Sequence, residues 1–147
     1  MQTVFQLNNI EKACFGRDAW SIQALVGEFE NAFSHFFAYE VEDKIVGYAC
    51  VRIMYEEAQI CNVAVLPEHR RKGIATELLQ AVADFAREQG CDHAELEVNV
   101  ENIAAVELYR KCGYDQVGIR KNFYRRTRYP SRDAYTMVLP LIDKKDE

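Results

Sequence analysis

The chain has 147 residues, of which 49% are hydrophobic and 28% charged, values typical of one globular domain with a sizeable core. Its net charge of −5 argues against general nucleic-acid binding, and no apolar run approaches the ~20 residues that a membrane-spanning helix needs. Residues 1–15 lack a basic stretch followed by an apolar one, so we expect no signal peptide. The five cysteines, without CxxC spacing, fit reduced thiols in the cytoplasm.

The first half of the chain is predicted to hold a short strand, helical segments and an antiparallel meander. We expect the strand at 3–7 and the helical segments between 9 and 31, where Ser21 has the residue type of an N-cap. Three strands follow, at 35–40, 45–54 and 59–65, joined by turns at 42–44 and 55–57.

The second half alternates between helices and strands. Apolar residues at helical spacing run from Ile74 to Ala86, and Gly90 then ends the helix. Further elements are predicted as a strand at 94–100, a helix at 102–112 with Asn102 as its N-cap, and strands at 114–119 and 134–139, followed by a frayed tail at 143–147. The order predicts one α/β domain over 1–142, with a mixed sheet of about seven strands and helices on both faces.

A short basic turn joins the third meander strand to the long helix, in the pattern Arg70-x-x-Gly73-x-Ala75. A helix that begins near Lys72 leaves its first amides unpaired, and glycine lets a ligand approach the backbone closely. The segment also supplies positive charges and a hydroxyl, from Arg70, Arg71, Lys72 and Thr76. The pattern therefore favours a pyrophosphate site, although an ordinary strand–helix connection would look the same. A P-loop and a dinucleotide-binding fold are disfavoured, because both glycine signatures are missing.

Four motifs occur in order over residues 60–114: Val63-Ala64-Val65, the Arg70-x-x-Gly73-x-Ala75 pattern, Leu96-Glu97-Val98, and Asn102-x-x-Ala105-x-x-Leu108-Tyr109-x-x-x-Gly113-Tyr114. Each is weak alone, but together they resemble the GNAT acetyltransferase superfamily. Narrower features resemble the bacterial ribosomal-protein-alanine N-acetyltransferases: Ala19-Trp20-Ser21, Leu96-Glu97-Val98-Asn99, Asn122-Phe123-Tyr124 and Asp133-Ala134-x-x-Met137.

This resemblance implies an N-acetyltransferase with acetyl-CoA as co-substrate and no metal. It also implies which residues bind acetyl-CoA: Val63, Ala64, Val65, Arg70, Arg71, Lys72, Gly73, Ile74, Ala75, Thr76 and Asn102. The first three would act through backbone groups, where two strands separate. The implied acceptor is the N-terminal alanine of a small-subunit ribosomal protein. Its amine would attack acetyl-CoA directly in a ternary complex. A basic protein tail is the expected partner, and neither a membrane nor direct nucleic-acid binding is expected.

Two side chains are candidates for the proton transfers. An α-amino group, with a pKa of about 7.7–8.0, is mostly charged near neutrality and needs a base. Strand alternation places Glu95, Glu97 and Asn99 on one face, which a solvated sheet surface would also explain. Tyr109 lies at helical spacing beside a buried face, as a core tyrosine would. The resemblance assigns the general base to Glu97 and the general acid, which protonates the departing thiolate, to Tyr109.

Several alternatives stay open from the residues alone. The acceptor amine could be a lysine side chain or a small molecule. The six positive charges within 120–132, with aromatic residues between them, would also suit a CoA-sensing or RNA-binding module without turnover. Covalent catalysis through cysteine and a zinc site are disfavoured, because neither a Cys–His arrangement nor finger-like spacing is present.

Overall fold

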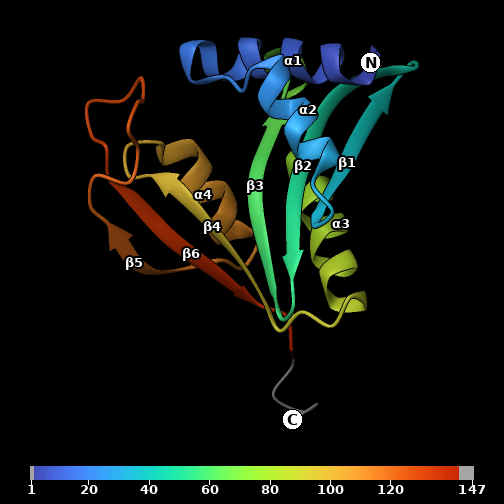
Figure 1. The fold of residues 1–147 in the computed structure, drawn as a ribbon. Coiled ribbons are helices and arrows are strands. Elements are labelled where there is room, and N and C mark those ends of the chain that lie inside the picture. The colour runs from blue at the N-terminus through green and yellow to red at the C-terminus, as the bar shows by residue number, and fades with distance from the viewer. Residues whose placement is uncertain (1, 143–147) are drawn as a thin grey trace.

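The computed structural model describes residues 2–142, and the predicted tail at 143–147 lies outside this range (Figure 1). The elements follow in this order: α1 (Gln2–Phe15), the 3-10 turn η1 (Gly16–Asp18), α2 (Ile22–Glu30), β1 (Ser34–Val41), β2 (Lys44–Met54), β3 (Glu57–Val65), the 3-10 turn η2 (Pro67–His69), α3 (Ile74–Glu88), β4 (His93–Asn99), α4 (Ile103–Lys111), β5 (Asp115–Arg120) and β6 (Ala134–Pro140). Within residues 2–142, no helix combines the length and apolar character needed to cross a membrane.

The described strands form a single mixed sheet in the order β1-β2-β3-β4-β6-β5. The pair β3–β4 is parallel and the other four pairs are antiparallel. The predicted meander, the later alternation of strands and helices, and the mixed sheet are therefore confirmed. The sheet has six strands where about seven were predicted.

The missing strand is the one predicted at 3–7, which was wrong because this segment forms the first turns of α1. Its apolar residues Val4, Phe5 and Leu7 form a short run of the kind that strands and helices share. Their burial, however, continues at helical spacing through Val4, Leu7, Ile10 and Cys14. These four side chains pack in one cluster with β2, and this tertiary contact favours the helix.

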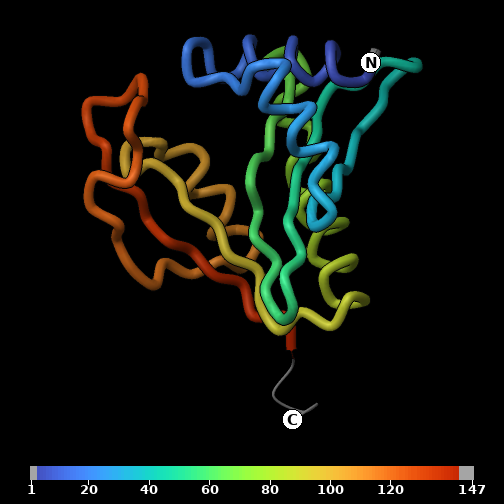
Figure 2. Tube along the Cα trace, in the orientation of Figure 1, coloured from blue at the N-terminus to red at the C-terminus, as the bar shows by residue number. Residues whose placement is uncertain are grey.

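The sheet opens in its middle, between β3 and β4. The two strands pair only at Glu57–His93, Ala58–Ala94 and Gln59–Glu95. Beyond that point they diverge, as the ribbon and the tube show (Figures 1 and 2). Residues 60–65 of β3 thus keep β2 as a neighbour on one side only.

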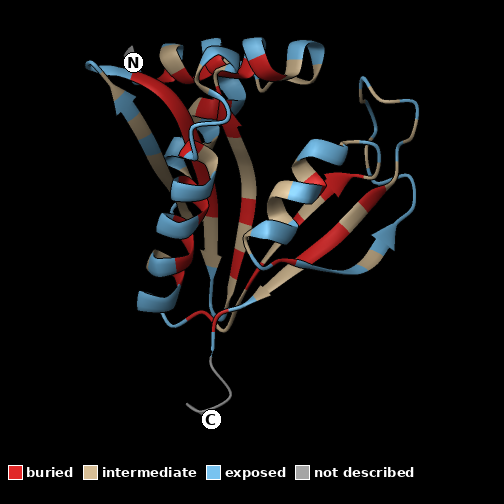
Figure 3. Cartoon of the chain, turned by 180° about the vertical axis from the view of Figure 1, so that it is seen from behind, coloured by how far each residue is buried: buried red, intermediate tan, exposed pale blue. Residues whose placement is uncertain are grey.

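Helices cover both faces of the sheet, as predicted. Viewed from behind, α3 and α4 lie on one face, while α1 and α2 lie across the other (Figure 3). The larger core joins the apolar stripe of α3, including Leu78 and Val82, to the sheet and to Val106 of α4. The smaller core joins α1 and α2, through Leu7 and Leu25, to β2 and β3.

A buried carboxylate ties α1 to the sheet beside the point where β3 diverges. Glu11 is fully buried, and its Oε2 accepts hydrogen bonds from the Tyr48 hydroxyl (2.9 Å) and from Asn62 Nδ2 (2.7 Å). Its Oε1 accepts the backbone N–H of Trp20 at 2.8 Å. Burial raises the pKa of Glu11, and this effect outweighs the hydrogen bonds that lower it.

We expect Glu11→Gln to change how stability depends on pH. Because the folded state raises the pKa of Glu11 above its ordinary value of 4.5, the folded chain holds this proton more tightly than the unfolded chain. The resulting stability is present below the unfolded-state pKa and is lost as pH rises through the folded-state pKa. Urea unfolding between pH 4.5 and 7.5 should therefore show wild type losing stability relative to Glu11→Gln as the pH increases. A constant difference between the two proteins would contradict this assignment.

Candidate active site

The turn between β3 and α3 presents a row of backbone amides. Arg71 has φ +64° and Gly73 has φ +79°, so the backbone passes twice through the left-handed region. Such alternation directs successive N–H groups toward one side and forms an anion-binding concavity. Within residues 2–142, the amides of 71–76 have no protein hydrogen-bond acceptor, whereas Glu77 N–H donates to the Gly73 carbonyl.

The side chains around these amides have different roles. Arg71, Lys72 and Thr76 are exposed next to the amides. Ile74 is buried in the larger core, so only its backbone faces a ligand. Arg70 turns back, and its Nε donates to the Val65 carbonyl at 3.1 Å, which fixes the end of β3. Arg70 therefore acts on the shape of the turn, and the amides offer the anion site.

The predicted backbone contacts lie on the part of β3 that has left β4. Val63, Ala64 and Val65 pair with Ala49, Tyr48 and Gly47 of β2. Val63 does not pair with β4, and its N–H donates to Asn62 Oδ1 at 3.1 Å. A β-bulge at Cys61 precedes these residues, since Val51 pairs with Ile60 and Cys50 with Asn62. The open edge of β3 can thus hold an extended ligand by main-chain hydrogen bonds.

Glu97 lies on β4 just beyond the last β3–β4 pair. Its side chain is only 9% exposed, with Arg120 Nε 3.6 Å from Oε1. Gln59 Nε2 donates to Oε2 at 2.9 Å from across the opening. The carboxylate is therefore held in place from β3 on one side and from the end of β5 on the other.

Tyr109 lies on α4, whose N-cap is Asn102. The Asn102 side chain accepts the Ala105 N–H at 3.3 Å, which confirms the predicted cap. Tyr109 is half-buried and meets Tyr114 edge-on, with ring centroids 6.0 Å apart. Burial raises the pKa of Tyr109 to about 12, so the phenol keeps its proton at neutral pH.

Tyr124 lies in the loop between β5 and β6. Burial raises the pKa of Tyr124 to about 12, and the negative charge of Glu97 raises it further. A held carboxylate, a protonated phenol, an open strand edge and a row of free amides are the groups that transfer of an acyl group from a phosphate-bearing thioester would need.

Residues 4–114 match the protein-family model described as the Acetyltransferase (GNAT) family. The chain belongs to the GNAT acetyltransferase family. It is 30% identical over 125 residues to a putative ribosomal protein bS18-alanine N-acetyltransferase of Bacillus subtilis (strain 168), covering 84% of this chain and 82% of the relative. It is also 30% identical over 133 residues to the ribosomal protein bS18-alanine N-acetyltransferase of Salmonella typhimurium, covering 84% of this chain and 89% of that protein.

Among solved structures, the ribosomal-protein-S18-alanine N-acetyltransferase from Escherichia coli resembles this GNAT protein with a TM-score of 0.87. Sequence identity is 26%, and the likeness covers 100% of this chain and 94% of that one. The predicted family, the N-acetyltransferase class and the likeness to ribosomal-protein-alanine N-acetyltransferases are thus confirmed. The residue roles and the location in the cytoplasm stay predictions.

Sequence reasoning missed the residues that hold Glu97 in this GNAT site. Gln59 and Arg120 lie 38 residues before and 23 residues after it, and neither belongs to one of the four motifs. The sequence shows only that Gln59 lies in an alternating strand and that Arg120 is charged. It does not show that either residue contacts Glu97, because that contact depends on the order of strands in the sheet.

The five cysteines are free thiols, and two of them meet near the β-bulge. Cys50 and Cys61 lie with Glu28 in a group whose ligand atoms are within 4.8 Å of one another. Arg52 forms an ion pair with Glu28 there and occupies the carboxylate. A hydrogen bond from Cys50 lowers the pKa of Cys61 and raises that of Cys50. Both side chains pack toward α1 and α2 and belong to a different cluster from Tyr109.

Proposed function

We propose that this GNAT protein transfers the acetyl group of acetyl-CoA to a protein N-terminus by direct attack in a ternary complex. The acceptor favoured by the named relatives is the N-terminal alanine of a small-subunit ribosomal protein. The observation that carries the proposal is the position of Glu97 where β3 leaves β4, beside the open edge of β3. A base at this position can meet an amine that approaches the opening.

Acetyl-CoA, when bound, supplies the acetyl group as a thioester. The amides of 71–76 and the exposed charges of Arg71 and Lys72 fit its pyrophosphate, and the open β3 edge at 63–65 fits its pantetheine arm. Glu97 accepts the proton of the attacking amine. Gln59 and Arg120 hold the carboxylate in a fixed orientation, which lowers the entropic cost of reaching the reactive geometry.

We propose that Tyr109 acts as a hydrogen-bond donor and not, as predicted from the family resemblance, as a general acid. A thiol titrates near 8.5, about 3.5 below the pKa of about 12 of this phenol, so transfer of the phenol proton to a thiolate is unfavourable. Tyr109 therefore serves as a hydrogen-bond donor to the departing sulfur, and it stabilises negative charge there without becoming a phenolate.

A peptide assay tests the proposed function. Peptides that begin with alanine are incubated with acetyl-CoA, in a free and a chemically blocked N-terminal form, each containing one lysine. We expect thiol release and a mass increase of one acetyl group with the free form only. Acetylation of the blocked peptide would transfer the activity to a lysine side chain, and thiol release with small amines alone would make a small molecule the acceptor.

We expect Gly73→Ala to weaken acetyl-CoA binding. Gly73 has φ +79°, which strains any residue with a Cβ, and the added methyl would project into space that the structure leaves open beside the amides. KM for acetyl-CoA should rise by about tenfold, corresponding to roughly 1.4 kcal/mol. KM is measured by thiol release at saturating peptide.

Gly90→Ala is the matched control for this change. Gly90 follows the other end of the same helix, with φ +86° and equally open surroundings. The Gly90→Ala substitution imposes the same kind of backbone strain, so it should lower stability without changing KM for acetyl-CoA. Equal KM values for both variants would show that the Gly73 turn does not bind the cofactor.

A further inference from the structure

Two cysteines meet across β2 and β3 at the β-bulge that precedes the open strand edge. Cys50 of β2 pairs with Asn62 of β3, and Cys61, which precedes Asn62, is the extra residue of the bulge. The Sγ atoms of Cys50 and Cys61 lie within 4.8 Å of each other. Opposed residues of antiparallel strands have Cα atoms about 4.5–5.5 Å apart, which is inside the range of about 4.4–6.8 Å that a disulfide spans. We call Cys50 and Cys61 the bulge dithiol.

The two thiols of the bulge dithiol differ in exposure and in acidity. Cys50 is fully buried, whereas Cys61 is only partly buried. A hydrogen bond from Cys50 lowers the pKa of Cys61, and the charge of Arg52 lowers it further, although burial acts in the opposite direction. The same hydrogen bond, together with burial, raises the pKa of Cys50. Cys61 is therefore the thiol that ionises more readily and that a small oxidant reaches first, and Cys50 is its buried partner.

The surroundings of the bulge dithiol suit thiol oxidation better than metal binding. Glu28 is the third residue that could offer a ligand atom there. Its carboxylate, however, forms an ion pair with Arg52 and accepts the Ser34 hydroxyl at 2.6 Å. A cation held by the two thiolates would lie close to the Arg52 guanidinium and compete with it for the carboxylate. The positive charge of Arg52 instead favours a thiolate at Cys61.

The bulge dithiol lies beside the strand edge that is proposed to hold acetyl-CoA. Val63, the first residue of that edge, follows Cys61 by two residues, which span about 7 Å in a strand. The edge has its open form in the structure, where both thiols are free. A disulfide has an S–S bond of about 2.05 Å and a preferred dihedral angle, so its formation would constrain the bulge against β2. Because hydrogen bonds weaken steeply with misalignment, main-chain groups at 63–65 that shift with the bulge would bind an extended ligand less well.

We propose that the bulge dithiol is a modification site for peroxides, at which Cys50 and Cys61 close to a disulfide and thereby weaken acetyl-CoA binding. The effect on acetyl-CoA rests on the function proposed above, whereas formation of the disulfide does not depend on it. Neither cysteine takes part in the acetyl transfer itself. The redox state of the two thiols instead sets the direction of the main-chain groups that the co-substrate meets.

The oxidation proceeds in two steps with a peroxide as oxidant. The Cys61 thiolate attacks one peroxide oxygen, the O–O bond breaks, and a sulfenic acid forms at Cys61 while the leaving hydroxide takes up a proton. The Cys50 sulfur then attacks the Cys61 sulfur, the S–O bond breaks, and the oxygen leaves as water with the Cys50 proton. Two thiols lose two electrons and two protons, and hydrogen peroxide is reduced to two molecules of water. The first step also removes the Cys61 thiolate, whose hydrogen bond and charge raise the pKa of Cys50, so the second step becomes easier.

Disulfide mapping by mass spectrometry tests the chemical step on the full chain after treatment with hydrogen peroxide. We expect the loss of two hydrogen atoms and a link between the peptides that hold Cys50 and Cys61, both reversed by a dithiol reductant. Cys61→Ser should prevent the link. Cys91→Ser, the matched control with a buried thiol in the larger core, should keep it. A link from Cys61 to Cys14, or further oxidation of Cys61 with Cys50 left free, would overturn the inference. Zinc that copurifies with wild type and is lost in Cys61→Ser would overturn it as well.

Titration calorimetry with acetyl-CoA tests the effect on binding without turnover. Oxidation should raise Kd about tenfold, a change of the size usual for coupling between two sites. We expect this rise in wild type and in Cys91→Ser, and no rise in Cys61→Ser, whose Kd should equal that of reduced wild type. A Kd that is the same with and without the mapped disulfide would overturn the inference with the proposed function intact. Reduced wild type that binds no acetyl-CoA would contradict the proposed function itself.

Discussion

Glu97→Gln is expected to lower kcat by about 10²–10⁴-fold, with KM for acetyl-CoA nearly unchanged. Glutamine has the same shape and can still meet Gln59 and Arg120, so the fold around the opening of β3 and β4 is kept. What is lost is the only group at this position that accepts a proton. The residual rate should rise with pH as the acceptor amine, with a pKa of about 7.7–8.0, loses its proton to water. Stopped-flow or thiol-release kinetics between pH 6 and 9 measure both effects.

Glu95→Gln is the matched control, on the same strand and the same face. Glu95 lies where β3 still pairs with β4, through the Gln59–Glu95 pair, and so one step short of the opening. A hydrogen bond with Glu57 and partial burial raise the pKa of Glu95. Its substitution should leave kcat within about twofold. If both variants lost activity equally, a general effect on the sheet would replace the assignment of Glu97 as base.

Tyr109→Phe is expected to reduce kcat by about 10–100-fold, because one hydrogen bond to the leaving sulfur is removed in a buried place. The ring and its edge-on contact with Tyr114 remain, so acetyl-CoA affinity should change little. Wild-type enzyme should show no loss of rate from Tyr109 ionisation below about pH 10, since burial raises the pKa of Tyr109 to about 12. An alkaline fall near pH 9 that disappears in Tyr109→Phe would contradict this role.

Tyr114→Phe separates the hydroxyl of Tyr109 from a general effect on this aromatic pair. Tyr114 is fully buried, and its hydroxyl has no hydrogen-bond partner in residues 2–142. Removing that hydroxyl should leave kcat unchanged and should not lower stability, because an unpaired polar group is taken out of the core. If Tyr114→Phe lowered kcat as much as Tyr109→Phe, the packing of the two rings, and not the Tyr109 hydroxyl, would control the rate.

Local signals in the sequence predicted local structure well. Ser21 and Asn102 were predicted as N-caps, and their side chains accept the Ala24 and Ala105 amides. Gly90 follows α3 with φ +86°, as the residue type indicated. The prediction at 3–7 was wrong, because a five-residue segment with a short apolar run fits a strand and a helix equally, and contacts with β2 decide between them.

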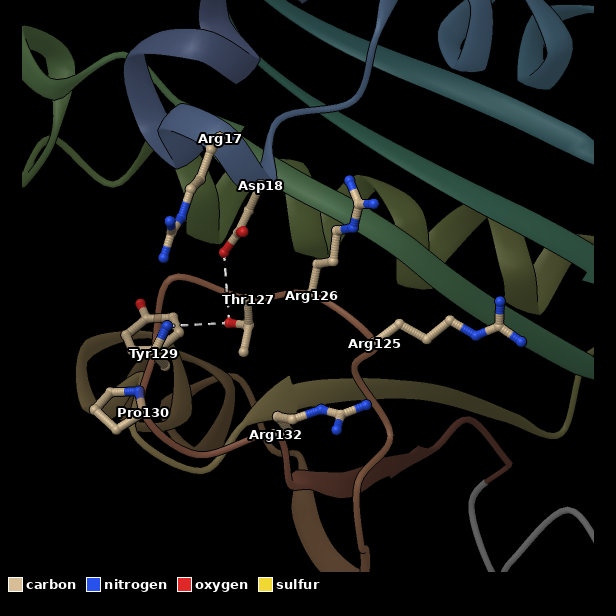
Figure 4. A pocket seen from close by; sticks show the side chains of 8 residues that line it. All are labelled: Arg17, Asp18, Arg125, Arg126, Thr127, Tyr129, Pro130 and Arg132. Carbon is tan, nitrogen blue, oxygen red and sulfur yellow. Dashed lines mark hydrogen bonds between the residues drawn. The ribbon is translucent and has the colours of Figure 1, made fainter.

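The candidate site was predictable where a motif spans neighbouring residues, as in the turn at 70–76. It was not predictable where residues distant in the chain meet. Asp18 and Arg128 are 110 residues apart, and no pattern in either segment specifies their contact. The exchange of order that places β6 between β4 and β5 also sets which loop reaches η1. The position of the loop 121–133 against η1 (Figure 4) depends on both features.

Because β3 pairs with β4 over a short stretch only, residues 60–65 of β3 form an unpaired strand edge in the middle of the sheet. Edges of this kind attract other strands and are a common origin of aggregation. An extended ligand beside residues 60–65 would act as a missing strand, pair the free main-chain groups and join the two halves of the sheet. Any ligand that does so favours the folded chain by mass action. If acetyl-CoA is that ligand, as proposed, we expect the thermal stability of this protein to rise with the concentration of acetyl-CoA.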